Sequence, residues 1–480
     1  MAAGDAGMDR RIPYRRVMPW LVAVGLFMEQ LDATVLNTAI PAISADLEAP
    51  ALSLKSVLTT YTLSLAVFIP ISGWIADRYG TRRVFRFAMA VFTLGSLLCA
   101  VSVNIGMLIA SRLLQGIGGA LMTPVGRLAL VRTFPRSEML TAMNFVVIPA
   151  LVAPLVGPFI GGAIVHVLPW RFIFLVNIPI GIAGWWMSRR FMPDYADPFT
   201  PALDRVGFLL FGAGVALLSY VLEVFGEHSW EWGGIGLMTL TSVMLLVGYG
   251  WHARRAGSPI LHMRMFRIRT FRVPVVGGFV TRLGVGGMPF LLPLLYQIGL
   301  GYTPLQAGLL TMPLAAAAIG MKVLGRRMLE RFGHRAVLNT NTVLLGANIG
   351  VFFWVGATTP VWVILALSFT QGLFSSLQFT ALNSLVYADV DDQEASKASS
   401  VASTAQQMAL SFGVAVASLV AGLFLRDVQQ TDAAGYITGL HWTFLSLGIF
   451  TLLSSLLFRE LHPADGANVS HHVLRREAVE

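Results

Sequence analysis

The stretch Gly73-Trp-Ile-Ala-Asp77-Arg78-Tyr-Gly80-Thr-Arg82-Arg83 lies between two long apolar runs, and its pattern recurs as Arg326-Arg-Met-Leu-Glu330-Arg331-Phe-Gly333-His-Arg335. An acid, a base, an aromatic residue, a glycine and a later arginine repeat at an offset of 253 residues. A weaker echo, at an offset of 256 residues, pairs Gln115-Gly116 with Gln371-Gly372. Two six-helix halves in direct succession would repeat after roughly 200 residues, so the surplus predicts two further membrane spans between the halves.

The composition is that of a membrane protein. Of the 480 residues, 55% are hydrophobic and 12% are charged, and the mean hydropathy is +0.70. A soluble protein carries about twice this charged fraction, because its core needs a polar shell. The net charge of +9 does not indicate nucleic-acid binding, since the basic residues form short clusters between apolar runs. Cys99 is the single cysteine, which excludes an intrachain disulfide and predicts a packing role.

Fourteen apolar runs are long enough to cross a bilayer as helices, since a span needs about 20 mostly apolar residues. The first run follows a basic start, but it is too long for a signal peptide and contains Glu29 and Asp32, so we expect it to be retained. An even number of spans places both chain ends on the same side. The runs lie near residues 17–40, 56–76, 84–104, 107–131, 141–166, 171–189, 206–225, 233–251, 272–298, 307–325, 336–356, 361–387, 397–425 and 439–458.

The distribution of basic residues orients the chain by the positive-inside rule. With the N-terminus in the cytoplasm, 28 of the 34 Lys and Arg residues fall on cytoplasmic segments or span ends. Three basic residues fall on the opposite side, and three lie within spans. The sequence therefore predicts a multi-pass protein of the cytoplasmic (inner) membrane with both termini cytoplasmic. The six exceptions are Lys55, Arg171 and Arg426 on the opposite side, and Arg112, Arg282 and Lys322 within spans.

The predicted architecture is an all-α polytopic membrane protein with a binding site near the midplane between two halves. Its segments are a cytoplasmic N-terminal tail (1–16), an N-terminal six-helix half (17–190), a linker with two additional transmembrane helices (191–255), a C-terminal six-helix half (256–459) and a cytoplasmic C-terminal tail (460–480).

The charged stretch after the second span admits two interpretations. Gly80 can adopt a left-handed conformation that ends a helix, while Asp77 and the arginines can link neighbouring helices. A charge network of this kind has to break and reform if the halves rock, which favours a gating role. The alternative is ordinary cytoplasmic positive charge beside a helix cap. The gating hypothesis involves Gly73, Asp77, Arg78, Gly80, Arg82 and Arg83.

Five motifs carry a resemblance to a known family. The stretch 73–83 resembles the loop signature of the major facilitator superfamily. Residues 31–41, Leu-Asp-Ala-Thr-Val-Leu-Asn-Thr-Ala-Ile-Pro, resemble the first-helix signature of its fourteen-helix drug:proton antiporter branch. Three more motifs are similar to the family's fourth-helix motif, its antiporter-associated fifth-helix motif and a further motif of the branch. They read Arg112-Leu-Leu-Gln115-Gly116-Ile-Gly118-Gly119, Ala153-Pro154-Leu-Val-Gly157-Pro158-Phe-Ile-Gly161-Gly162 and Trp170-Arg171-Phe-Ile-Phe-Leu-Val-Asn177-Ile-Pro179.

Within this branch the sequence most resembles the MdtD-type subgroup of exporters. The resemblance implies the major facilitator fold, with two six-helix halves and two inserted helices. It also implies proton-coupled efflux of small organic molecules or drugs by alternating access, and hence antibiotic resistance. The energy source would be the proton gradient, with no cofactor.

Ionisable residues within the first and fourth spans are the candidates for proton coupling. Glu29 and Asp32 are three residues apart and so share one helix face, and intramembrane carboxylates are costly and usually face a cavity. Burial and a nearby arginine act in opposite directions on a carboxylate's proton affinity, so Asp32 can release and rebind a proton. Arg112 lies at comparable depth and can meet Asp32. The alternative is a static ion pair, and proton coupling rests on the resemblance.

The fifth span carries two rows of small residues and prolines. Small residues allow close helix approach, and each proline bends the helix, so a packing face is the first interpretation. The resemblance adds that the bend closes the site against leakage. One row is Ala153, Gly157 and Gly161, and the other is Pro154, Pro158 and Gly162.

Two cations within spans are unexpected in an exporter of cationic drugs. Arg282 lies near the midplane at the 253-residue offset from Glu29, so it either pairs with Glu29 across the halves or binds an anionic substrate group. Lys322 lies near a cytoplasmic helix end and can simply snorkel to the interface. The polar candidates for lining the substrate cavity, apart from Arg282 and Lys322, are Asn37, Gln297, Gln378 and Asn383.

The leading hypothesis is therefore proton antiport of small organic molecules by a monomer in the lipid bilayer, with other efflux components as optional partners. One rival is export of an anionic metabolite, such as an organic acid or its metal chelate. A second rival is a sensor or scaffold that transports nothing. No Walker A pattern, metal-ligand cluster or nucleophile-elbow motif occurs, so we expect neither an enzyme nor a metal site.

Overall fold

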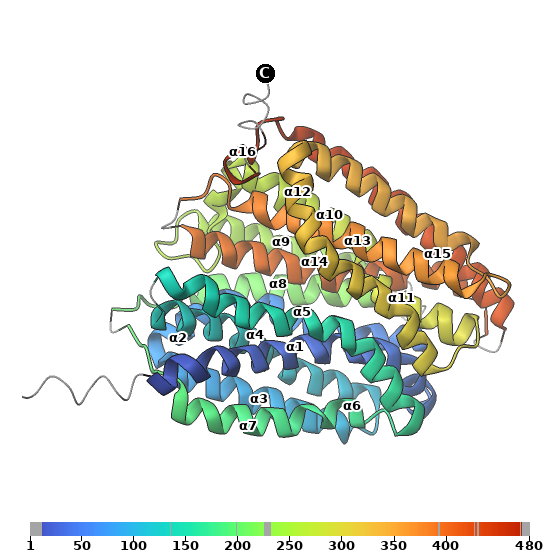
Figure 1. Cartoon of the computed structure of the whole chain (residues 1–480), viewed down its shortest axis with the longest axis horizontal. Helices are drawn as coiled ribbons and strands as arrows, with labels where there is room; N and C mark the ends of the chain where they lie inside the picture. Colours follow the sequence, from blue (N-terminus) through green and yellow to red (C-terminus); the bar gives the residue numbers. More distant parts are fainter. Residues whose placement is uncertain are drawn as a thin grey trace, which may run out of the picture.

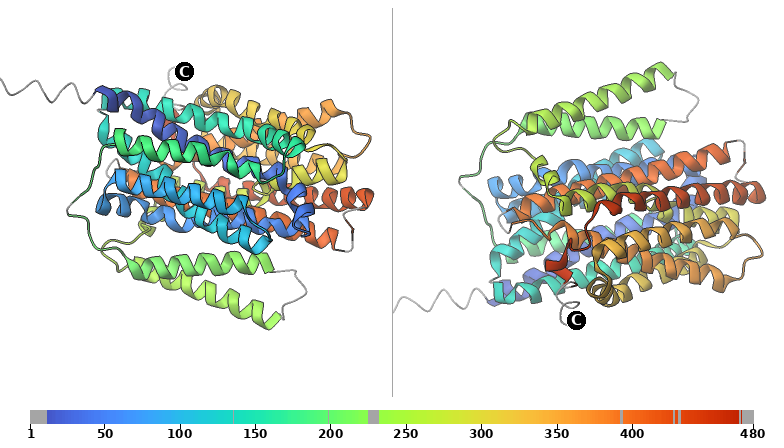
Figure 2. Two further views of the ribbon diagram at one scale, coloured as in Figure 1. Left: turned by 90° about the horizontal axis from the view of Figure 1, so that it is seen from below. Right: turned by 90° about the horizontal axis from the view of Figure 1, so that it is seen from above.

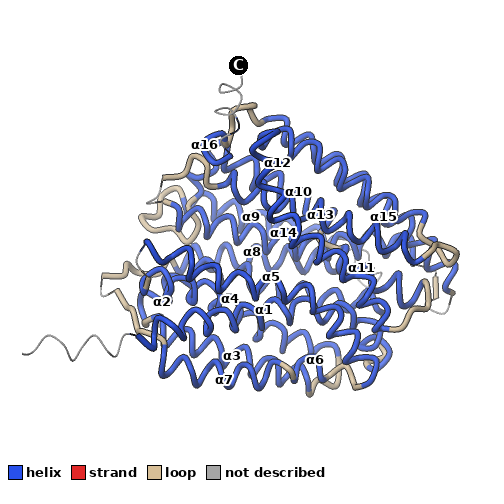
Figure 3. Tube along the Cα trace, in the orientation of Figure 1, coloured by secondary structure: helices blue, strands red, loops and turns tan. Residues whose placement is uncertain are grey.

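In a computed structural model, the described residues are 12–134, 136–197, 199–224, 232–391, 394–426, 428–429, 432–470 and 472. Their regular structure is helical throughout, and these segments contain no strand (Figure 3). The helices are α1 (Ile12–Asp46), η1 (Ala51–Leu54), α2 (Lys55–Tyr79), α3 (Thr81–Ala100), α4 (Ile105–Thr133), α5 (Arg136–Val167), α6 (Phe172–Leu175), α7 (Asn177–Phe191), α8 (Arg205–Val224), α9 (Trp232–Ala253), η2 (Met263–Arg267), α10 (Arg269–Val285), α11 (Met288–Leu294), η3 (Leu295–Gly299), α12 (Pro304–Val351), η4 (Phe352–Trp354), α13 (Val361–Val386), α14 (Ala395–Leu425), α15 (Ala433–Ser454), η5 (Ser455–Glu460) and α16 (Ala467–Ser470).

The apolar helices account for the predicted spans. Thirteen helical segments of the described chain are long and apolar enough to cross a membrane. The shorter apolar segment Val152–Val167 belongs to α5, a 32-residue helix. The predicted span 307–325 and most of the span 336–356 lie in α12, which ends at Val351 and has a non-helical residue at Gly333. The fold is the all-α polytopic architecture that the sequence predicts.

The helices form two halves with a separate pair beside them. In Figure 1 the first seven helices occupy the lower part and α10 to α15 the upper part, and α2 and α5 of one half contact α14 and α12 of the other. Helices α8 and α9 pack against each other on one side of the molecule, where α8 contacts α2 and α14 (Figure 2). Both ends of the described chain, the start of α1 and α16, lie toward the left of Figure 1.

Glycines break the chain at the two repeated motifs. Gly80 has φ +95° between α2 and α3, and Gly333 has φ +74° within α12. Side chains other than glycine rarely adopt such angles, so each glycine turns the chain in one residue. The sequence suggests loops at the repeated stretches 73–83 and 326–335, but apart from the glycines these residues are helical, so the loops are much shorter than expected. Because one glycine suffices for the turn, the flanking charged residues belong to helix ends.

Candidate functional site

An ion pair buried in the N-terminal half is the most polar feature of the core. Asp32 of α1 and Arg112 of α4 are 4% and 0% exposed, and Arg112 Nη1 lies 2.5 Å from Asp32 Oδ2. The comparable depth of the two residues in their helices predicts this contact, and the structure confirms it. Removing either charge leaves the other without its counter-ion in a dry interior, where an unpaired charge is costly.

Amide side chains complete the coordination of the Asp32 carboxylate. Gln115 Nε2 and Asn177 Nδ2 each donate to Asp32 Oδ1 at 2.8 Å. Gln115 Oε1 also accepts from Arg112 Nη1 at 2.6 Å, and Gln115 Nε2 reaches Ser96 Oγ at 2.7 Å. The ion pair is therefore one part of a network that joins α1, α3, α4 and α7, and we call these five side chains the Asp32 network.

The Arg112 guanidinium has fewer hydrogen-bond partners on the side that faces away from Asp32. Arg112 Nε donates to Val57 O at 3.3 Å, and the Tyr61 ring lies 4.1 Å from the guanidinium carbon. Aromatic faces attract cations, and the effect grows when water is excluded. Arg112 Nη2 and the Tyr61 hydroxyl are buried without a hydrogen-bond partner among the described residues. This leaves Arg112 with a spare donor that a rearranged carboxylate can occupy.

Glu29 lies one turn before Asp32 but in different surroundings. It is 7% exposed and accepts a short hydrogen bond from Thr123 of α4. It also lines a cavity of about 700 Å³ between the two halves. Asp32 and Glu29 thus lie on the same face of α1, as the sequence predicts, but Asp32 is enclosed in its network whereas Glu29 borders the cavity.

The larger cavity opens at the end of the bundle that carries Gly80. Its walls are α1, α2 and α4 on one side and α14 on the other, closed laterally by the segments that flank α8 and α9. Ionisable and amide groups are distributed over all of these walls, so the cavity is partly polar. They include Glu29, Gln30, Arg127, Asp204, His262, Lys397, Gln406 and Gln407.

The opposite end of the bundle is closed by tight contact between the halves. The second row of α5 packs on α12, where a Cβ at Gly162 would overlap the Pro304 carbonyl oxygen, and one at Gly308 the Pro158 carbonyl. Gln297 Nε2 donates to Thr38 O at 2.9 Å across the same end. The close approach that small residues allow is thus used at the interface between the halves.

The first small-residue row of α5 has a different partner. A Cβ at Gly157 would overlap the Thr34 hydroxyl, and one at Gly161 would overlap the Thr38 hydroxyl and the Val35 carbonyl. The helix α5 is therefore wedged between α1, which carries Asp32, and α12 of the other half. The contact therefore connects the helix of Asp32 to the closed end through α5.

The charged motif at Gly80 makes its contacts within its own half. Asp77 pairs with Arg132 of α4 at 2.6 Å, and Arg82 and Arg83 each lie 3.6 Å from Asp194. The segment after α7 thus covers the glycine turn. Gly73 has open space around its Cα, and no ion pair of Arg78 is present among the described residues.

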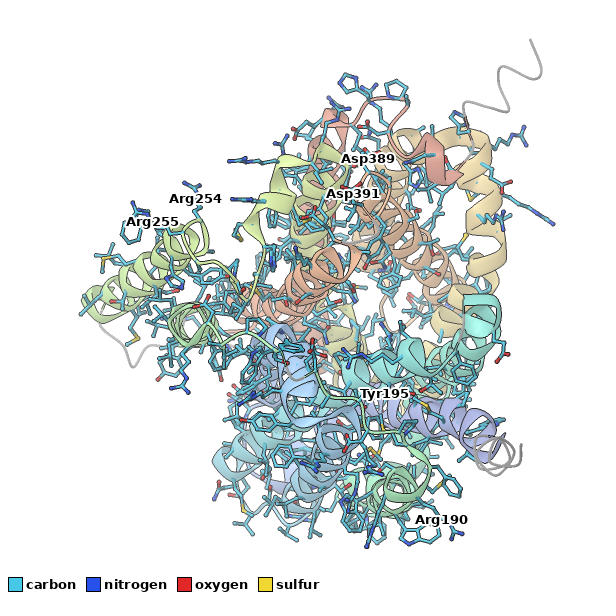
Figure 4. The ribbon with its side chains drawn as sticks, turned by 90° about the vertical axis from the view of Figure 1, so that its left-hand side faces the viewer. Arg190, Tyr195, Arg254, Arg255, Asp389 and Asp391 are labelled. Carbon is cyan, nitrogen blue, oxygen red and sulfur yellow. The ribbon has the colours of Figure 1, made fainter. Side chains whose placement is uncertain are left out.

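Figure 4 looks onto this end of the bundle. Tyr195, which bonds Thr81 through its backbone N–H and its carbonyl at 3.0 Å each, lies over the N-terminal half, with Arg190 toward the rim. Arg254 and Arg255 mark the end of the inserted pair, while Asp389 and Asp391 lie on the C-terminal half.

Arg282 lies in a second cavity, inside the C-terminal half. The cavity has a volume of about 230 Å³, and Gln378 also lines it. The predicted pair between Arg282 and Glu29 is absent: Glu29 bonds Thr123, and Arg282 makes no ion pair with any described residue. The pair was predicted from the 253-residue offset between the two residues, but their side chains face different cavities.

The other polar candidates are distributed unevenly. Asn37 Nδ2 donates to Ala33 O at 3.5 Å within α1, and Gln297 bridges the halves, so neither lines the two cavities. Asn383 of α13 is also absent from their walls. Lys322 lies in α12, and its side chain is outside the described part of the chain.

Sequence reasoning missed several partners of the predicted residues. Gln115 and Asn177 stand in the quoted motifs, and an amide within a span was the signal that could have marked them. Ser96 and Thr123 are two of many Ser and Thr residues in the helices, and nothing in the sequence around them marks them as partners of Asp32 or Glu29. Asp194 falls in a polar segment, where one acid is unremarkable until the chain folds back on Gly80.

The sequence profile of the Major Facilitator Superfamily matches residues 22–414 and, in a second alignment, 275–478. The chain belongs to the major facilitator superfamily. It is therefore a membrane transporter rather than an enzyme, of a kind that uses no cofactor. Among the described residues, no group of three or more His, Cys, Asp or Glu is placed to hold a metal ion.

Curated relatives are similar over almost the whole chain. A protein of Serratia proteamaculans named "Putative multidrug resistance protein MdtD" is 38% identical over 446 residues, which cover 93% of each chain. The protein of the same name from Klebsiella pneumoniae is 38% identical over 459 residues, covering 95% of this chain and 96% of the relative. The resemblance to the MdtD-type subgroup is thereby confirmed.

Solved structures show the same fold at low identity. A D-xylose-proton symporter aligns with a TM-score of 0.67 and 14% identity, covering 95% of this chain and 99% of the symporter. A peptide transporter crystallised with sulfate aligns with a TM-score of 0.68 and 13% identity, covering 94% and 95%. At these identities the likeness concerns the fold alone.

Proposed function

We propose that this transporter exports small organic molecules, including drugs, across the cytoplasmic membrane in exchange for protons. The buried Asp32–Arg112 pair is the observation that carries the proposal. An ionisable pair inside a membrane protein is costly and is typical of proton and substrate pathways. The names of the relatives support drugs as substrates, and the Arg and Lys distribution supports a cytoplasmic location for the Gly80 end and both termini.

The two ends of the bundle correspond to one state of an alternating-access cycle. The cavity that contains Glu29 opens at the proposed cytoplasmic end, while α5 and α12 close the other end. In this state substrate enters from the cytoplasm. Opening the far end requires α5 to separate from α12, and closing the near end requires the halves to approach around the larger cavity.

Proton binding to Asp32 couples the two movements. Protonation removes the charge that holds Arg112 Nη1, and the guanidinium then depends on Gln115, Val57 and the Tyr61 ring. This weakens the link between α1 and α4, and α1 is also the helix on which α5 packs. For exchange, the proton binds to Asp32 while the far end is open and moves inward as that end closes. Its release to the cytoplasm then restores the Asp32–Arg112 pair of the present state. In this scheme Asp77, Arg132, Arg82, Arg83 and Asp194 form the gate at the near end.

Flux measurement in liposomes tests the proposal. Purified full-length protein is reconstituted, and substrate-dependent proton movement is followed with a pH-sensitive dye for a series of cationic and anionic compounds. Asp32→Asn should abolish proton movement while substrate still binds. Proton movement unchanged in Asp32→Asn would refute the assignment, and absence of substrate-dependent flux in the wild type would favour a sensor or scaffold.

A further inference from the structure

The smaller cavity lies wholly within the C-terminal half and has no counterpart in the proton scheme. Residues of α10, α11, α12, α13 and α14 line it, and its volume is about 230 Å³. None of the lining residues is Asp or Glu, and most of the wall is apolar, with Val285, Leu314, Leu345 and Phe379 among the lining side chains. The cavity is therefore an apolar chamber with few polar groups.

Two hydrogen-bond donors in this chamber have no hydrogen-bond partner among the residues that the structure describes. The Arg282 guanidinium makes no ion pair with the described residues and lies 6.0 Å from the Phe379 ring. Gln371 Nε2 is buried without a hydrogen-bond partner in the described chain, because Gln371 uses its Oε1 to accept from Asn348 at 2.8 Å. Buried donors are nearly always satisfied in folded proteins, so the free amide of Gln371 indicates a missing acceptor. The half-buried Arg282 guanidinium lines the same cavity and is a cation within a membrane span.

We infer that the cavity binds a small organic anion, with one carboxylate against Arg282 and Gln371 and a flat apolar body against Phe379. This inference rests on the proposed function and names a substrate class for it. A single carboxylate fits because the described residues of the wall include one cation and one free amide donor, so a second charge would lack a partner among them. The volume is below the range of about 300–1,000 Å³ for drug-sized ligands, which favours a one-ring compound.

The two cavities differ in polarity. The larger one is wide and carries groups of both charges, among them Glu29, Arg127 and Lys397, whereas the smaller one offers a cation in apolar surroundings. A carboxylate gains a charge-assisted, potentially bidentate contact with an arginine, and its ring replaces water along the apolar wall. The neutral amide of the same shape gains only the second contribution.

Binding of radiolabelled benzoate to the purified full-length protein in detergent tests the inference, with benzamide as the neutral isostere. Wild-type protein should bind benzoate more tightly than benzamide. Arg282→Gln should weaken benzoate binding on the order of 10- to 100-fold, the range for a lost charged hydrogen-bond partner, and leave benzamide binding unchanged. Arg282→Lys should recover part of the affinity. The matched control Arg255→Gln changes an exposed arginine stacked on Trp251 and should have no effect.

A second substitution keeps the test informative if Arg282→Gln fails to fold. Gln371→Glu retains an acceptor for Asn348 and introduces a carboxylate beside Arg282, so it should exclude benzoate as strongly as Arg282→Gln. Equal binding of benzoate and benzamide to wild type, or benzoate binding unchanged in folded Arg282→Gln or Gln371→Glu, would overturn the inference. If the benzoate test fails but proton-coupled flux of cations is still measured, the inference is wrong and the proposed function stands. If benzoate binds as expected but no substrate-dependent flux is measured, the proposed function is wrong and the anion site stands.

Discussion

Replacing Asp32 by Asn removes the carboxylate that lies 2.5 Å from Arg112 Nη1 and leaves a fully buried guanidinium without its counter-ion. Two unit charges about 4 Å apart attract each other by about 4 kcal/mol at an effective dielectric constant near 20. Removal of one partner of a buried ion pair costs about 3–5 kcal/mol. The asparagine oxygen can still accept from Gln115 and Asn177, so we expect the lower part of this range, about 3 kcal/mol.

A double-mutant cycle separates the ion pair from the rest of the network. The variants are Asp32→Asn, Arg112→Leu and the two combined, with the free energy of unfolding in mixed micelles measured by tryptophan fluorescence. Because the double variant leaves no unpaired charge, it should be more stable than the sum of the single losses predicts, by about 2–3 kcal/mol. The single variants should also lose substrate-driven proton movement.

An additive cycle would refute this reasoning. If Asp32→Asn changed the free energy of unfolding by less than about 1 kcal/mol, the guanidinium would have to be hydrated, as surface ion pairs are. Arg112 would then not be a buried, unsolvated charge, and there would be no physical reason for protonation of Asp32 to weaken the contact between α1 and α4.

Three further outcomes are expected. Gly162→Val places a branched side chain against the Pro304 carbonyl, where close helix approach requires a small residue, so the closed end cannot form. The initial rate of transport should fall at least about 10-fold at normal membrane abundance. An unchanged rate would contradict the role of this contact. Gly80→Ala forces a φ of +95° on a residue with a Cβ and should cost about 1–3 kcal/mol in the free energy of unfolding, so a neutral effect would disprove a rigid turn. Burial is the largest single influence on the pKa of Asp465 and raises it. The hydrogen bonds from Arg269 and from the His462 backbone N–H, together with the nearby positive charge, outweigh burial, and the net shift of the pKa is downward. A lowered folded-state pKa gives stability that is present above the unfolded value near 3.9 and is lost as the pH falls through the folded value. Hydrogen exchange of residues 461–470 should therefore be slower in wild type than in Asp465→Asn at pH 6, with the difference vanishing at low pH; a difference that persists there would exclude the carboxylate as its source.

The ion pair shows how far sequence reasoning reached into the site. Burying a charged side chain in a membrane helix is costly, and an acid and a base at similar depth can offset that cost by forming an ion pair. Asp32 and Arg112 could therefore be paired before the fold was known. Arg282 and Glu29 offered the same kind of argument, by their symmetric offset, and it failed. Symmetry of position in two halves does not specify which way a side chain points, and each of these residues faces its own cavity.

The fifth span illustrates a different limit. Its glycine and proline rows predict close packing, because only a small residue lets another helix backbone approach. The sequence contains nothing that specifies the partner of each row. The structure assigns one row to α1 and the other to α12, and this difference links the helix of Asp32 to the interface between the halves.

The sequence by itself determined the membrane class, the all-helical fold and the turn at Gly80, because hydrophobic length and glycine conformation are local properties of the chain. The Asp32 network, the closure of one end and the placement of Arg282 in an apolar chamber were decided only by tertiary structure. These features depend on side chains from distant helices that share a few ångströms of space, and helix rotation and tilt, which packing sets, control that arrangement.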